Sequence, residues 1–138
     1  MICCLARHTK NLLVPKQLYL VAALSWAGVI AFFCLVQLDT IPLGNVSNLD
    51  KLVHLFFHFV LTILWFLYLV KKINPINVRK AGLLAVLFSV FFGIAIEIVQ
   101  EVFTLTRHGD VLDVFANVSG AICGVAVVIL FQFRTRVK

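Results

Sequence analysis

The side chains best suited to chemistry gather at the ends of hydrophobic segments, and nearly every acidic residue of the chain is among them. They are Asp50, Lys51 and His54 at the start of one segment, Glu97, Gln100 and Glu101 near the end of the next, and Arg107, Asp110, Asp113 and Asn117 leading into the last. Carboxylates and imidazoles transfer protons, bind cations and form hydrogen bonds with polar ligands. In a chain otherwise built for lipid, this gathering marks the candidate functional site.

The apolar segments that position these residues are long enough to cross a membrane. Hydrophobic residues make up 62% of the 138-residue chain, far above the roughly 45 to 50% apolar usage of soluble domains. A span needs about 20 mostly apolar residues, and four segments qualify, at about 17–38, 52–70, 81–103 and 111–133. We therefore predict an all-α integral membrane protein, a four-transmembrane-helix bundle formed by a single domain over residues 1–138. We expect the first segment to be retained, because its apolar run is too long for a signal peptide.

Basic residues flank the spans on one predicted side of the membrane. Lys and Arg accumulate in cytoplasmic segments close to span ends, and here they occupy the amino terminus, the connection 71–80 and the carboxyl-terminal tail. We therefore expect both termini to be cytoplasmic and the candidate site to face outward. The net charge of +6 then reflects topology and contact with anionic membrane lipids. Nucleic-acid binding is not expected, because the basic residues form short separate flanks rather than one patch.

Helical spacing places the polar residues on faces that can point at one another. Lys51, His54 and His58 are three and four residues apart, which puts them on one face of a helix. Asp110, Asp113 and Asn117 repeat the same spacing and are followed by two glycines, Gly120 and Gly124. This small-xxx-small pair predicts a close helix contact within the bundle.

Polar groups inside a span need partners or water. An ionisable side chain near the centre of a span costs roughly 2.5 to 3.5 kcal/mol on insertion scales. One interpretation is a buried structural network, in which Lys51 and Arg107 neutralise the nearby carboxylates. The number of costly groups on one side favours instead a site for a polar ligand or for chemistry.

Metal binding and acid-base catalysis are the two chemistries that the residue types allow. His54 and His58 with Glu97 or Glu101 could ligate zinc, yet the Glu that would complete an HExxH motif is replaced by Leu55. We predict no resident metal and no cofactor. The candidate catalytic residues are Glu97, His54 and Asp113, with Glu97 and Asp113 as a possible acid and base. His108 is expected to be a solvated loop residue.

The order of these polar residues resembles the VanZ-like family, named for a membrane protein associated with teicoplanin resistance. The match covers about residues 50–124 and rests on three motifs. They are Asp50-Lys51-x-x-His54, Glu97-x-x-Gln100, and Arg107-x-x-Asp110-x-x-Asp113-x-x-x-Asn117-x-x-Gly120-x-x-x-Gly124. The resemblance implies a small helical domain of the bacterial cytoplasmic membrane, with a link to the cell envelope or to glycopeptide tolerance, and it leaves the reaction open.

Two functions are compatible with this pattern, and a third is less so. The leading hypothesis is an outward-facing cavity that binds a lipid-linked envelope molecule, glycolipid or glycopeptide. Its ligand-binding residues would be Asp50, Lys51, His54, Glu97, Gln100, Arg107, Asp110, Asp113 and Asn117. The alternative is an intramembrane hydrolase or transferase with Glu97 and His54 as an acid-base pair. A proton-coupled transporter would need polar residues in the inner halves of the spans, which are almost wholly apolar. The oligomeric state stays open.

Overall fold

Four helices make up the part of the chain that the computed structural model describes, which comprises residues 15–35, 49–72, 78–103 and 110–136. The helices are α2 (Lys16–Leu35), α3 (Leu49–Lys72), α4 (Val78–Phe103) and α5 (Val111–Arg136), and no strand occurs within these ranges. Each helix is long and apolar enough to cross a membrane. The predicted all-α fold with four spans is therefore confirmed, although residues 36–38 of the first predicted span lie outside the described ranges.

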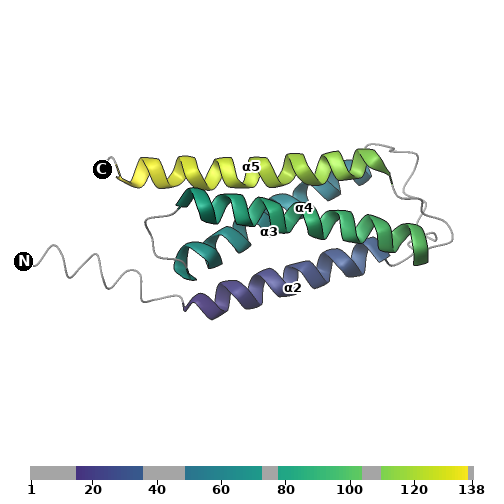
Figure 1. Cartoon of the computed structure of the whole chain (residues 1–138), viewed down its shortest axis with the longest axis horizontal. Helices are drawn as coiled ribbons and strands as arrows, with labels where there is room; N and C mark the ends of the chain where they lie inside the picture. The colour runs from purple at the N-terminus through teal and green to yellow at the C-terminus, as the bar shows by residue number, and fades with distance from the viewer. Residues whose placement is uncertain (1–14, 36–48, 73–77, 104–109, 137–138) are drawn as a thin grey trace, which may run out of the picture.

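The four helices run side by side along one long axis, as Figure 1 shows. α3 and α4 each pack against the other three helices, and the most extensive helix–helix contact is between α3 and α5. Such a bundle satisfies every backbone hydrogen bond of the helix interiors within each helix, as a lipid environment requires. Because α3, α4 and α5 all touch one another, side chains from these three helices can meet.

Two glycines bring α3 and α5 into backbone contact. A methyl group at Gly120 would overlap the carbonyl oxygen of Leu55, and one at Gly124 would lie 2.8 Å from the carbonyl oxygen of Phe59. Small residues allow such close approach of helices in membranes. The predicted close contact within the bundle is confirmed, and it fixes α5 directly against the face of α3 that carries His54.

Apolar packing holds the rest of the bundle. One buried cluster joins α3, α4 and α5 through Phe66, Ala85 and Val128, and another joins α2 to α3 and α4 through Ile30, Leu61 and Ile96. Large side chains such as Phe91, which is 68% exposed, face outward. An exposed apolar surface of this kind suits a lipid environment.

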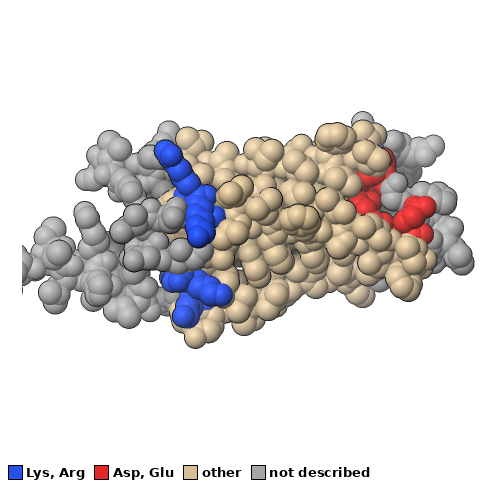
Figure 2. All heavy atoms as spheres, viewed as in Figure 1, with Lys and Arg blue, Asp and Glu red and all other residues tan. Residues whose placement is uncertain are grey.

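Charged side chains are separated between the two ends of the bundle. On the face seen in Figure 2, Lys and Arg side chains gather at one end of the bundle and Asp and Glu side chains at the other, whereas Lys51 lies at the acidic end, where it pairs with Asp110. The last turn of α3 ends in Lys71 and Lys72, whereas its first turn carries Asp50. This separation matches the pattern from which the orientation was predicted, and the orientation itself stays a prediction.

Candidate functional site

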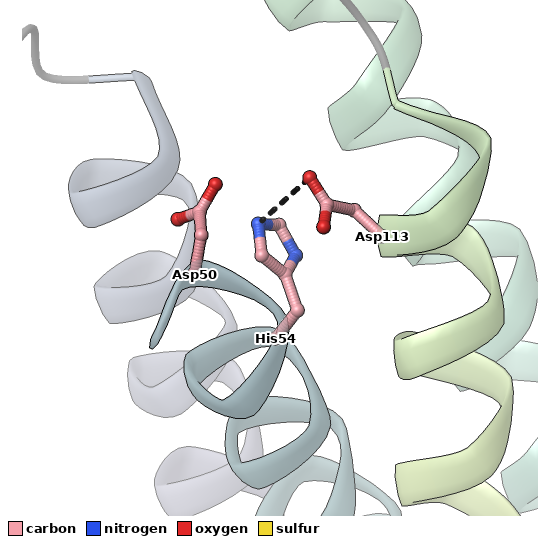
Figure 3. Close-up of side chains that lie close together, drawn as sticks. All are labelled: Asp50, His54 and Asp113. Carbon is pink, nitrogen blue, oxygen red and sulfur yellow. Dashed lines mark ion pairs between the residues drawn. The ribbon is translucent and has the colours of Figure 1, made fainter. Parts of the chain in front are cut away.

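His54 lies at the centre of a buried polar cluster at the acidic end of the bundle. Its Nδ1 atom is 3.2 Å from Asn117 Oδ1 and 3.7 Å from Glu97 Oε1, and its Nε2 atom is 4.0 Å from Asp113 Oδ2. Figure 3 shows the imidazole between the carboxylates of Asp50 and Asp113. The cluster thus combines α3, α4 and α5, as the spacing of these residues predicted. Their role as a functional site remains a prediction.

Helix geometry explains why the members of this cluster meet. Asp50 and His54 are four residues apart on α3, and Asp113 and Asn117 are four apart on α5, so each pair shares a helical face. The close contact at Gly120 presses these two faces together. Glu97, on α4, contributes its carboxylate to the same cluster around His54.

Several polar atoms of the cluster lie buried without a hydrogen-bond partner among the described residues. Glu97 and Asp113 are each only 6% exposed, yet both oxygens of Glu97, Asp113 Oδ1 and Asn117 Nδ2 make no hydrogen bond there. Leaving a buried polar group unsatisfied costs roughly 1 to 3 kcal/mol, and more for a charged group. These atoms have the capacity to hydrogen-bond to water or to a polar ligand.

Lys51 and Asp110 form an ion pair at the edge of the cluster. The Lys51 Nζ to Asp110 Oδ2 distance is 3.3 Å, and both side chains are partly exposed. Asp110 also caps α5, because its Oδ1 accepts a hydrogen bond from the Leu112 amide at 2.9 Å. This amide and the Lys51 ammonium hold the pKa of Asp110 below its ordinary value. The pairing agrees with the structural-network interpretation for Lys51.

Gln100 and Glu101 occupy different surroundings at the end of α4. Gln100 is buried and donates a hydrogen bond of 2.7 Å from its Nε2 to the carbonyl oxygen of Cys34, so that it joins α4 to α2. Glu101 lies exposed in the last turn of α4. The two residues thus share the end of α4 with Glu97, and their part in a ligand site stays a prediction. Arg107 and His108 lie outside the described residues.

His58 belongs to a separate contact one turn deeper. Its Nδ1 atom lies 2.8 Å from Ser89 Oγ on α4, and its ring packs near Phe92 at a centroid distance of 6.3 Å. Gly93 leaves room for it, since a methyl group at that glycine would lie 2.9 Å from His58 Cε1. The structure thus pairs His58 with a serine rather than with the zinc set of His54 and Glu97 considered from the sequence.

We expect Ser89→Ala to destabilise the bundle by about 1 to 3 kcal/mol, because the buried His58 ring loses its hydrogen-bond partner. Thermal unfolding in detergent micelles would measure the change. The matched control is Ser25→Ala on α2, where the serine is exposed, and its effect should stay within about 0.5 kcal/mol. Equal stability of the two variants would show that the His58–Ser89 contact contributes little.

A groove between α4 and α5 adjoins the cluster and was not foreseen from the sequence. It has a volume of about 520 Å³ and is lined by Ile94, Glu97, Ile98, Glu101, Asp110, Val111 and Val114. Glu97 belongs to both the groove and the His54 cluster, so the two are continuous. The available sequence signal was the helical spacing of Ile94, Ile98 and Glu101 with Glu97, which places apolar and acidic residues on one face of α4.

The fold and this site define a multi-pass helical membrane protein with a polar cluster at one end. The chain matches the family model described as VanZ/LLP1 over residues 7–132, nearly its whole length, and it belongs to this family. The resemblance seen in the three motifs is thereby confirmed, and the match also includes the first span. No curated protein and no solved structure matches the chain.

Proposed function

We propose that the protein binds an amphipathic, lipid-linked molecule of the bacterial cell envelope. The polar part of the ligand would occupy the cluster around His54, and its apolar chain would lie along the groove between α4 and α5. The observation that carries this proposal is the position of Glu97, whose buried carboxylate lies 3.7 Å from His54 and also lines a partly apolar groove. A molecule that is polar at one end and apolar along its length fits such a surface.

The charges of the site favour a ligand rich in hydrogen-bond donors. The cluster contains three carboxylates, Asp50, Glu97 and Asp113, whereas Lys51 is already paired with Asp110. Carboxylates accept hydrogen bonds from hydroxyl, amide and ammonium groups. Sugar hydroxyls and amino groups of an envelope glycolipid or glycopeptide have this chemistry. Recognition of an anionic ligand group by Lys51 would first require the Lys51–Asp110 pair to open.

We place the protein in the bacterial cytoplasmic membrane, with its termini in the cytoplasm and the cluster facing outward. The support is the basic end of the bundle, which is typical of the cytoplasmic side. In this orientation the cluster faces the compartment in which cell-wall intermediates are assembled and glycopeptides act. A contribution to glycopeptide tolerance would then follow from binding such a molecule or altering its exposure.

An intramembrane hydrolase or transferase is the alternative function. The 3.7 Å distance between His54 Nδ1 and Glu97 Oε1 is close enough for a proton to pass through one water molecule or a small side-chain movement. Product formation after incubation of the protein with envelope lipids would distinguish this enzyme from a binding protein.

The binding proposal predicts that filling the groove abolishes ligand capture. We expect Val114→Trp to reduce binding of lipid-linked cell-wall intermediates by at least about tenfold, because the indole would occupy the groove beside Glu97. Binding would be measured in nanodiscs against a panel of these lipids and of glycopeptides. The control is Val127→Trp, which changes the same residue type at an exposed position further along α5.

The two tryptophan variants should unfold at similar temperatures, so that any difference in binding reflects the groove. Unchanged binding by Val114→Trp, or binding by neither wild type nor control across the panel, would contradict the proposal. In the second case the structural-network interpretation would be favoured.

A further inference from the structure

We propose that Asp50, His54 and Asp113 form a binding site for one divalent metal ion of the zinc type. Among the described residues these three offer ligand atoms that all lie within 4.8 Å of one another. Figure 3 shows the two carboxylates on either side of the imidazole, one from the first turn of α3 and one from the first turn of α5. The sequence predicted no resident metal, and this set differs from the His54–His58 pair considered there, because His58 is directed to Ser89.

The hydrogen bond between His54 and Asn117 prepares the imidazole for a metal. An amide oxygen can only accept, so Nδ1 of His54 donates its hydrogen to Asn117 Oδ1 in the 3.2 Å contact. In the neutral ring the Nε2 atom then carries a lone pair, and it points at Asp113 Oδ2 from 4.0 Å. Metal-ligating histidines almost always donate their other ring N–H to a nearby acceptor in this way.

The convergence of lone pairs would favour a cation at this point. Nε2 of His54 and the carboxylate oxygens of Asp50 and Asp113 face the same small volume, and three acceptors cannot hydrogen-bond to one another. A cation between them removes the repulsion. Protonation of Nε2 is the competing explanation, and it predicts that no metal binds.

Buried oxygens without partners provide a second, independent observation. Asp113 is 6% exposed and directed at His54, and its Oδ1 atom has no hydrogen-bond partner among the described residues. Glu97 is equally buried, its Oε1 lies 3.7 Å from Nδ1 of the same imidazole, and neither of its oxygens accepts a hydrogen bond in that part of the chain. A metal ion with a bound water molecule would offer these oxygens a positive charge and a hydrogen-bond donor.

The ligand types select the class of metal. One imidazole nitrogen and two carboxylate oxygens suit zinc and similar divalent transition metals, whereas magnesium favours an all-oxygen shell. Ligand atoms bound to zinc at roughly 2.0 to 2.2 Å are about 3.4 Å apart in a tetrahedral site, so the side chains must draw together slightly. Asp50 is exposed in the first turn of α3 and has room to move. Three protein ligands leave a fourth position for water or a substrate group.

Metal loading of the whole protein tests the site without any lipid ligand. The protein would be purified without a histidine tag, with Cys3→Ser and Cys4→Ser so that this adjacent pair of thiols cannot bind zinc. It would be stripped with a chelator and titrated in nanodiscs with Zn²⁺, Co²⁺ or Mg²⁺. Elemental analysis would give the stoichiometry, and the visible spectrum of the Co²⁺ form would report its coordination. We expect one zinc ion per chain, a cobalt spectrum of four-coordinate type, and at least tenfold weaker binding of Mg²⁺.

Single substitutions locate the bound metal. Asp50→Asn and His54→Gln should each weaken zinc binding by at least tenfold, while His58→Asn, a histidine change on the same helix, should not. Asp50→Asn is the safest variant because its side chain is exposed, and it keeps the test valid if His54→Gln does not fold. Absence of zinc binding by the wild type, or full binding by Asp50→Asn, would overturn the proposal. The groove experiment with Val114→Trp is unaffected by either outcome.

Discussion

Gly120→Ala is expected to destabilise the bundle by about 3 kcal/mol, near the upper end of the usual cost of overpacking. The added methyl group would overlap the carbonyl oxygen of Leu55, and this atom belongs to a helix backbone that cannot rotate away. α3 and α5 would have to separate. Because His54 adjoins Leu55 and Asn117 lies one turn before Gly120, the 3.2 Å contact between them would open as well.

The control for this substitution is Gly28→Ala on α2. A methyl group at Gly28 would meet nothing within 4 Å, so Ala should keep or raise stability by up to about 1 kcal/mol through its better helix propensity. Thermal or denaturant unfolding in micelles would measure both variants. If Gly120→Ala were as stable as Gly28→Ala, the helices would not be packed as closely as the structure shows.

The helices and their polar faces could be predicted because they depend on local sequence. Apolar length determines a span, and spacing of three and four residues determines a face. These rules were sufficient to predict that His54, Asp113 and Asn117 lie close together. The small residues Gly120 and Gly124 even indicated where two helices would touch.

The contacts around α4 could not be predicted, because they depend on how that helix is rotated against its neighbours. Glu97, Gln100 and Glu101 lie on one broad face, and the edges of that face meet different helices. Gln100 reaches the carbonyl of Cys34 on α2, while Glu101 lines the groove toward α5. Sequence spacing shows which residues share a face of a helix, but it does not show which neighbouring helix each of them contacts. For the same reason it did not reveal that His58 pairs with Ser89.

Glu97→Gln should raise stability by about 1 kcal/mol while reducing ligand binding by at least about tenfold. Glu97 is a buried carboxylate whose oxygens lack hydrogen-bond partners among the described residues. The isosteric amide removes a charge that the folded protein does not compensate fully. Binding falls because the amide is a weaker acceptor for hydroxyl and ammonium donors. Substitutions that raise stability at the expense of function are typical of functional sites.

Whether Glu97→Gln raises or lowers the free energy of unfolding distinguishes a ligand site from a structural network. If Glu97 serves mainly as the partner of His54 at 3.7 Å, its loss breaks a buried pair and should cost about 3 to 5 kcal/mol. Glu101→Gln provides the stability control, because its carboxylate is exposed on the same helix and its replacement should change the unfolding free energy by less than about 0.5 kcal/mol. Unfolding in micelles and binding in nanodiscs would be measured on the same batch of each purified variant. A less stable Glu97→Gln variant with normal ligand binding would assign the carboxylate to the structural network. Replacement of a ligand-site residue is expected instead to raise stability and to weaken ligand binding.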